Sequence, residues 1–220
     1  VWRRGEALAD AILFFEGESD DVAAFPSVEH DGDETHLFAQ RAVTFFETEY
    51  YYARGVDGEQ AQLPFPLNTD LNGVLDGRAI AFLREDWSHN GKDYPQGAVI
   101  AYKLASGDAE LVFAANERQS VEGVGVGKSN IIIQYLDDVS GNAARLTRGR
   151  NGKWKSKDIK MPANGVVEIA SSGGGTDDAI LSFESMTTPE SLYYVAADNK
   201  VEKIMETPAF YDATGVVVEQ

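Results

Sequence analysis

Cysteine is absent from the 220 residues of the chain, and histidine occurs only three times. Without thiols the sequence has no disulfides, no thiolate zinc sites and no cysteine nucleophile. No apolar run approaches the ~20 residues that a membrane-crossing helix needs. Basic residues are scarce as well, since 19 Lys and Arg face 36 Asp and Glu, for a formal charge of −17. Such an acidic chain repels phosphate backbones, so we expect no nucleic-acid partner. Because no apolar run is long enough to cross a bilayer, we expect no membrane partner either.

The composition that remains is that of a folded globular chain, with 43% hydrophobic and 25% charged residues. Its dominant pattern is short runs of β-branched and aromatic residues that end at Gly, Asp or Asn, as strands do. The most apolar run covers residues 131–136. No 3.6-residue periodicity persists over three turns, so the predicted fold class is all-β.

The apolar runs repeat at a spacing of about 45 to 50 residues, which is the range of four-stranded propeller blades. Each repeat has a first strand of small residues, a long apolar strand, a third strand and a more polar outer strand. First strands are expected at 22–25, 71–75, 121–126 and 166–170. We therefore predict a β-propeller with about four four-stranded blades, at 20–67, 69–115, 120–161 and 165–207. A β-sandwich with similarly spaced strands remains the alternative.

Residues 1–17 are too few for a whole repeat. Residues 1–4 and 12–15 are expected to be the last two strands of a preceding blade, so the chain would begin within a blade. Residues 208–220 are expected to lead out of the last blade. Because open strand edges invite pairing with another chain, we expect the isolated chain to self-associate.

A search for catalytic motifs assigns no residue. The sequence has no Gly-x-Ser-x-Gly nucleophile elbow, and residues 171–175 carry Ser and Gly in the wrong order for one. Residues 123–129 suggest a phosphate loop, but Glu122 occupies the place of its first glycine and a strand, not a helix, follows. We therefore expect a strand of small residues and a turn at this point.

The titratable residues have structural explanations as well. His30 and His36 flank Asp31-Gly32-Asp33-Glu34, which could hold a metal but favours a solvated hairpin turn. The pairs at 20–21, 137–138 and 177–178 are expected to form turns, because adjacent strand residues point in opposite directions and cannot share a proton. We assign no catalytic, cofactor-binding or metal-binding residue, and no cofactor.

Two further clusters could be binding surfaces. Tyr50–Tyr52 and Tyr193-Tyr194 could form an aromatic platform, but strands between packed sheets need large residues on both faces, so core packing is favoured. A basic hairpin with Asn151-Gly152 at its tip is expected to be a solvated edge, with an interdomain contact as the alternative. Its basic residues are Arg145, Arg148, Arg150, Lys153, Lys155 and Lys157.

Several segments resemble the propeller of the prolyl oligopeptidase family of serine peptidases. The strand–hairpin segment at 83–97 (LREDWSHNGKDYPQG) and the run at 183–193 (FESMTTPESLY) carry most of the resemblance. Residues 136–139 resemble a recurrent turn, and residues 2–5 resemble a blade segment. Residues 210–220 look like the passage from the propeller into the peptidase domain. The resemblance extends over nearly the whole chain, in the expected order.

This resemblance implies a role in which the chain supplies no catalytic group. Family members have seven blades, and their propeller covers the active site so that folded proteins cannot reach it. The catalytic Ser, Asp and His lie in an α/β-hydrolase domain, which would follow Gln220. The implied partners are that domain and short peptides, which the parent serine endopeptidase would cleave after proline. The compartment remains open between cytoplasm and periplasm, and a non-catalytic propeller scaffold for protein binding is the alternative function.

Overall fold

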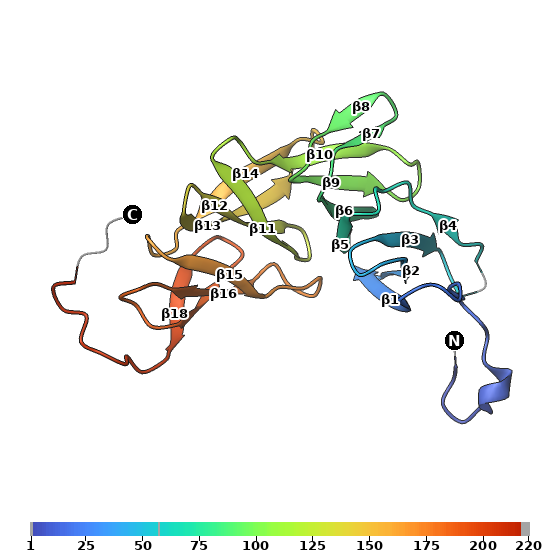
Figure 1. The fold of residues 1–220 in the computed structure, drawn as a ribbon, viewed down its shortest axis with the longest axis horizontal. Helices are drawn as coiled ribbons and strands as arrows, with labels where there is room; N and C mark the ends of the chain where they lie inside the picture. The colour runs from blue at the N-terminus through green and yellow to red at the C-terminus, as the bar shows by residue number, and fades with distance from the viewer. Residues whose placement is uncertain (1, 57, 217–220) are drawn as a thin grey trace. The chain divides into compact units, whose positions relative to one another are not determined.

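The computed structural model describes residues 2–56 and 58–216, and its main elements are four four-stranded antiparallel sheets (Figure 1). The first sheet contains β1 (Ala23–Asp31), β2 (Glu34–Ala42), β3 (Thr48–Ala53) and β4 (Ala61–Gln62). The second contains β5 (Thr69–Leu75), β6 (Arg78–Leu83), β9 (Ala98–Lys103) and β10 (Ala109–Ala114). The third contains β11 (Gln119–Val126), β12 (Ile131–Asp137), β13 (Ser140–Arg148) and β14 (Trp154–Ile159). The fourth contains β15 (Val166–Ser171), β16 (Ala179–Glu184), β17 (Ser191–Val195) and β18 (Val201–Glu206).

The strands of every sheet lie side by side in chain order. This confirms the predicted all-β class and the repeat of four strands, in which the small-residue runs open each sheet. A separate hairpin, β7 (Trp87–His89) with β8 (Lys92–Tyr94), is inserted between β6 and β9. The only helix among the described residues is the 3-10 turn η1 (Leu8–Asp10). No helix in that part of the chain is long and apolar enough to cross a membrane.

The chain divides into two compact units. The smaller holds the residues up to Asp70 together with Leu83–Gln96, and thus the first sheet and the β7–β8 hairpin. The larger holds Leu71–Phe82 and the chain from Gly97 onward, and thus almost all of the other three sheets.

The core of the larger unit is built on β12, whose side chains are apolar on both faces. Ile131 and Ile133 belong to a cluster with strands of the second sheet, whereas Ile132 belongs to a cluster with strands of the fourth sheet. All three are at most 1% exposed. Successive strand residues point to opposite faces, so an uninterrupted apolar run is what a strand between two sheets requires. Burying each isoleucine stabilises the fold by roughly 1.5–3 kcal/mol.

The core of the smaller unit is aromatic. Phe38 and Tyr52 pack with ring centroids 5.3 Å apart, and the Tyr52 hydroxyl lies 3.1 Å from Nδ1 of His36. Gly32, at φ 61°, makes the predicted turn between β1 and β2. His36, which flanks this turn, is only 4% exposed. The strand β2 begins at Glu34, and its two-residue period places His36 on the same buried face as Phe38.

The β7–β8 hairpin carries its own small aromatic cluster. Trp87 stacks on His89 with ring centroids 4.6 Å apart, and Phe65 meets Trp87 edge-on at 5.8 Å. Asn90 and Gly91 turn the chain with positive φ values of 50° and 74°, as a two-residue hairpin requires. The segment that carried the family resemblance therefore folds as the expected strand and hairpin.

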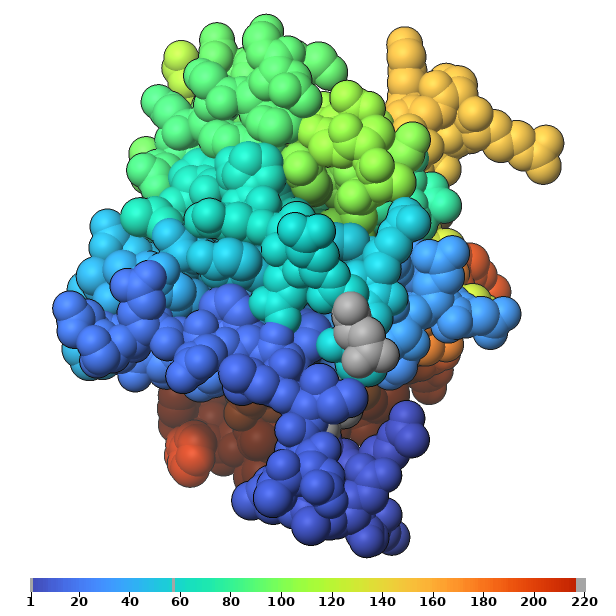
Figure 2. Space-filling view, turned by 90° about the vertical axis from the view of Figure 1, so that its right-hand side faces the viewer, coloured from blue at the N-terminus to red at the C-terminus, as the bar shows by residue number. Residues whose placement is uncertain are grey.

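Residues 2–22 form no strand, so the two strands expected at 1–4 and 12–15 are not formed in the described part of the chain. Leu13 is 72% exposed, and Figure 2 shows the N-terminal stretch in dark blue projecting from the rest of its unit. A strand exists only where a neighbouring strand takes its backbone hydrogen bonds, and no strand of this unit pairs with these residues. Val1 and residues 217–220, the end of the expected exit segment, lie outside the described residues.

Candidate functional site

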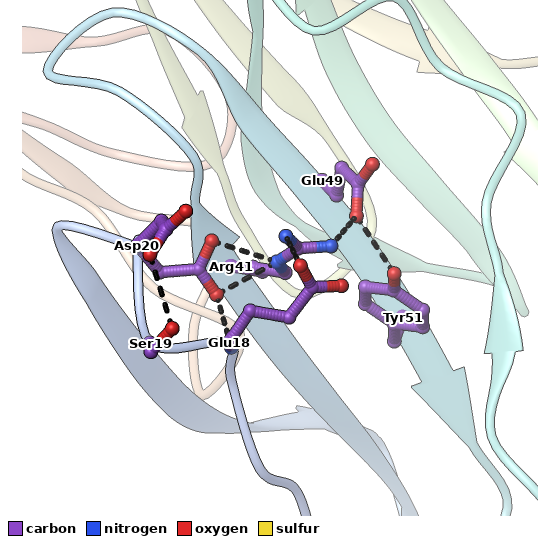
Figure 3. A network of polar contacts seen from close by, with 7 residues as sticks. Glu18, Ser19, Asp20, Arg41, Glu49 and Tyr51 are labelled. Atoms are coloured by element: carbon purple, nitrogen blue, oxygen red, sulfur yellow. Dashed lines mark hydrogen bonds and ion pairs between the residues drawn. The ribbon is translucent and has the colours of Figure 1, made fainter.

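The smaller unit holds a charge cluster centred on Arg41 of β2 (Figure 3). Its Nε donates to Asp21 Oδ2 at 2.7 Å, while Nη1 lies 3.2 Å from Glu49 Oε2 and Nη2 lies 3.1 Å from Glu18 Oε2. Tyr51 extends the cluster by donating its hydroxyl to Glu49 at 2.7 Å. One guanidinium thus ties the 18–21 loop, β2 and β3 together.

The electrostatics of this cluster favour its charged form. The hydrogen bond from Arg41 lowers the pKa of Asp21, and the Asp21 carboxylate in turn raises the pKa of Arg41. Burial, and to a lesser degree the Glu49 contact, raise the pKa of Tyr51. A carboxylate held ionised by a fixed cation is a poor proton acceptor. The cluster is therefore an anchor for the first sheet, and the Asp20-Asp21 pair does more than form a turn.

In the larger unit, the Asp177 carboxylate joins the turn after β11 to the loop before β16. Its oxygens accept hydrogen bonds from the Ser129 backbone amide, the Ser129 hydroxyl and the Asn130 side-chain amide, each at 2.6 Å. The Lys128 amide donates to the Thr176 carbonyl at 2.9 Å beside it. The glycine-rich segment 123–129 is thus strand β11 and a turn held by a carboxylate, as the sequence predicted.

Arg145 departs from the predicted solvated hairpin, because its side chain is buried. It lies on β13, is 5% exposed, and donates to Asn199 Oδ1 at 2.6 Å, to the Ala196 carbonyl at 3.1 Å and to the Asp177 carbonyl. Burial lowers the pKa of this guanidinium. The side chain points between two sheets because β13 is a third strand and not an outer one.

Arg148 on the same strand is half-buried and binds Glu110, with Nε 2.8 Å from Oε1. The exposed basic residues of the hairpin are Arg150, Lys153, Lys155 and Lys157.

A cavity of about 380 Å³ lies at the β15–β16 loop. Tyr194, which is 37% exposed and so is not a core residue, lies in its wall beside Asp178. Their hydrogen bond lowers the pKa of Asp178 and raises that of Tyr194. The hydrogen bond thus favours the carboxylate form of Asp178 and the phenol form of Tyr194, and the two side chains give the cavity a polar wall. The other residues around it are Ser171, Ser172, Gly173, Gly175, Thr176, Ala179 and Ile180.

The remaining histidine and tyrosine candidates from the sequence lie within hairpins and the sheet core. Thr35 Oγ1 lies 3.4 Å from His30 Nδ1, within the β1–β2 hairpin. Tyr50 and Tyr52 are at most 9% exposed, as core packing predicts. Within residues 2–56 and 58–216, no group of three or more His, Asp and Glu side chains is arranged to hold a metal ion.

Known proteins place this arrangement in a family. Residues 1–208 match the family described as prolyl oligopeptidase, N-terminal beta-propeller domain. An uncharacterized peptidase of Sinorhizobium fredii is 32% identical over the full length of this chain, which covers 32% of that protein. A second relative, an uncharacterized peptidase of Rickettsia prowazekii, is 21% identical with the same coverage. The chain thus spans about a third of the length of these curated relatives.

Solved structures share the fold. A post-proline cleaving enzyme from Rickettsia typhi superimposes with a TM-score of 0.83 at 18% identity, over 100% of this chain and 33% of that one. Oligopeptidase B from Trypanosoma brucei gives a TM-score of 0.62 at 11% identity, over 84% and 27% of the two chains. The chain therefore belongs to the family of N-terminal β-propeller domains of prolyl oligopeptidases.

Proposed function

We propose that this propeller restricts access to the active site of a serine peptidase that cleaves short peptides after proline. In this proposal the Ser, Asp and His of the catalytic triad belong to a hydrolase domain of the same polypeptide, outside the chain described here. The observation that carries the proposal is the family match over residues 1–208, in a chain that spans about a third of its relatives.

The physical contribution of the propeller is steric. Blades packed through fully buried side chains form a stiff wall, because close-packed interiors deform little. Short flexible peptides would pass through a narrow channel in this wall, or through the opening between the domains. Folded proteins would be too large for either route. The charge clusters around Arg41 and Arg145 support this role, since both join separate segments of the chain into rigid units.

The test uses the full-length protein and one post-proline cleavage sequence presented in two ways. The sequence is supplied as a free peptide of about ten residues and as an exposed loop of a stable folded host protein. We expect cleavage of the free peptide only, and no cleavage by a variant whose elbow serine is replaced by alanine. Equal cleavage of both substrates would refute the gating role, and cleavage of neither would refute the peptidase assignment.

The isolated 220-residue chain is also proposed to self-associate. Its first and last sheets carry partly exposed apolar side chains, among them Phe25 at 54% and Ile204 at 51% exposure. Exposed apolar sheet surface and unpaired strand edges favour association. Light scattering over a concentration series should therefore show a mass above 24.0 kDa. A monomer at every concentration would contradict this proposal.

A further inference from the structure

The β2–β3 turn of the smaller unit, residues 43–47, exposes two adjacent phenylalanines. Phe45 is 86% exposed and Phe46 is 83% exposed. Scattered apolar residues are ordinary on protein surfaces, but two neighbouring aromatic rings at one turn tip form an apolar patch. We call residues 43–47 the diphenylalanine turn. Phe, Tyr and Trp dominate the energetics of interfaces because each buries a large area with few rotatable bonds.

The diphenylalanine turn has a fixed backbone. The Val43 amide donates to the Glu47 carbonyl at 2.9 Å, which closes the loop. Thr44 Oγ1 accepts hydrogen bonds from the amides of Phe46 at 3.2 Å and Glu47 at 3.1 Å. A turn that is already ordered loses little conformational entropy when it binds, so the two rings are presented in a form suited to docking.

The base of this turn is anchored as firmly as its tip. Arg41 and Glu49 face each other across β2 and β3, directly below the turn, and form the ion pair of the cluster in Figure 3. Asp21 holds the other side of the same guanidinium. The Arg41 cluster therefore has a consequence beyond stability, since it fixes the direction in which the turn projects.

Other segments of the smaller unit meet at the same end of the first sheet. The Thr48 amide donates to the Leu67 carbonyl at 2.8 Å, which places the connection after β4 beside the base of the turn. The Arg84 amide donates to the Asn68 carbonyl at 2.9 Å, which brings the start of the β7–β8 segment to that connection. Leu67 is itself 37% exposed. This end of the sheet is therefore a built surface with apolar side chains, and not a single loose loop.

The fourth sheet, in the larger unit, has the same organisation independently. Its β16–β17 turn carries Met186, which is 74% exposed, and the chain that leaves β18 runs back past this turn. In that segment Phe210 is 99% exposed and Tyr211 is 56% exposed, and the Tyr211 hydroxyl donates to the Met186 carbonyl. In both units, exposed apolar side chains gather at the sheet end where the second and third strands join and where the chain leaves the fourth strand.

We propose that the diphenylalanine turn docks into an apolar recess of the peptidase domain of the same polypeptide. Two thirds of each curated relative lies outside the part that this chain covers, so a covering partner of sufficient size belongs to the same protein. The chain beyond β18 leaves its sheet at the end that corresponds to the turn. A second copy completing the propeller would instead approach the open strand edges. The identity of the partner as a peptidase domain rests on the proposed function.

The experiment places the photoreactive residue p-benzoylphenylalanine at position 46 of the full-length protein. The matched control carries it at Asp33, which is exposed in the β1–β2 turn at the opposite end of the same sheet. After irradiation, mass spectrometry should find intramolecular cross-links from position 46 to residues beyond 220, and none from position 33. Cross-links from position 46 only to a second copy, only to residues within 1–220, or to nothing would overturn the proposal.

A double substitution gives an independent measurement. Phe45→Ser with Phe46→Ser should leave the far-ultraviolet circular dichroism unchanged, because both rings are exposed. It should accelerate hydrogen exchange at the facing surface of the peptidase domain by about tenfold or more, as loss of two aromatic anchors predicts. Leu111→Ser, on an outer strand, is the control and should leave that exchange unchanged. Equal exchange in all variants would contradict docking. Neither readout uses catalysis, so a protein that cross-links as expected but cleaves no peptide would refute only the proposed function.

Discussion

Replacing Arg145 by methionine tests whether a buried charge holds two blades together. The guanidinium is fixed between β13 and the loops at 177 and 196–199 by three hydrogen-bond acceptors. Methionine keeps most of the apolar stem of arginine but has no donor. The substitution therefore removes the polar contacts while leaving the strand and its apolar neighbours in place.

The magnitude follows from the acceptors that lose their donor. The carbonyls of Asp177 and Ala196 and the side-chain oxygen of Asn199 would each lose a charge-assisted hydrogen bond. An orphaned buried acceptor costs about 1–3 kcal/mol, but loops near the surface regain part of this by binding water. Three such acceptors, each partly compensated by water, should together cost roughly 3 kcal/mol. Opening of these loops should therefore become about a hundredfold more frequent.

The measurement is hydrogen exchange resolved by residue, with urea unfolding as a global check. Exchange should rise most at amides 127–130, 177–179 and 196–200, the segments that Arg145 and Asp177 connect. The control is Arg148→Met on the same strand, because its partner Glu110 is 31% exposed in the side chain. A partly exposed ion pair of this kind contributes less than ~1 kcal/mol.

Two results would refute this reasoning. Arg145→Met could lose no more stability than Arg148→Met, which would show that water replaces the buried guanidinium without cost. Exchange could also rise evenly over the whole larger unit, which would show that Arg145 supports the fold in general and not these loops. Arg145→Lys adds a graded test: it keeps the charge but loses the forked geometry, so an intermediate effect is expected.

Three further substitutions test other parts of the chain. Asp21→Asn should flatten the acid limb of the stability curve: Arg41 lowers the folded pKa of Asp21, so its contribution is present above about pH 4 and disappears as the pH falls through that lowered value. Thermal melts between about pH 5 and 2 would show it, and identical curves would contradict it. Gly141→Ala should lower the free energy of unfolding by roughly 1–3 kcal/mol, because a Cβ would lie 2.6 Å from the Val167 amide nitrogen. An unchanged melting temperature would show that the neighbouring backbone moves aside without cost. Phe183→Ala, at 1% exposure, should cost about 3–5 kcal/mol in urea unfolding, and a loss below ~1 kcal/mol would place the ring outside the core.

The strands could be predicted from the sequence because their signals are local. Residues 131–133 are apolar without alternation, and the structure places Ile131 and Ile132 in two different core clusters. Turn residues mark the strand ends for equally local reasons, as Gly32 and Gly91 show with their positive φ. Repetition of these signals at a spacing of about 45 to 50 residues then indicated a propeller, because this is the length of a four-stranded repeat.

The strands expected near the N-terminus are not formed in the described residues because a strand also needs a partner. Residues 12–15 have the β-branched and aromatic composition of a strand, yet Ile12 and Leu13 are 48% and 72% exposed. Composition describes what a segment would contribute to a sheet. It does not provide the neighbouring backbone that would take its hydrogen bonds.

The buried polar residues were missed because their partners are far away in the sequence. Arg145 binds Ala196 and Asn199, 51 and 54 residues further along the chain, and His36 binds Tyr52, 16 residues away. A charged residue within a strand normally indicates a solvated face, and Lys155 and Lys157 in the same hairpin obey that rule. The one available signal was position: Arg145 lies in the third strand of a repeat, which has neighbouring strands on both sides.

The pair Asp177-Asp178 shows how far the local argument reaches. Adjacent strand side chains were expected to point in different directions, but these two residues lie in the loop before β16 and have different partners. Asp177 binds Ser129, and Asp178 accepts a hydrogen bond from the Ala197 amide at 2.9 Å. The different directions of the two carboxylates let one loop hold two other loops at once. The sequence indicated a turn at this pair, whereas the partners of its side chains depend on which loops the order of the strands brings together.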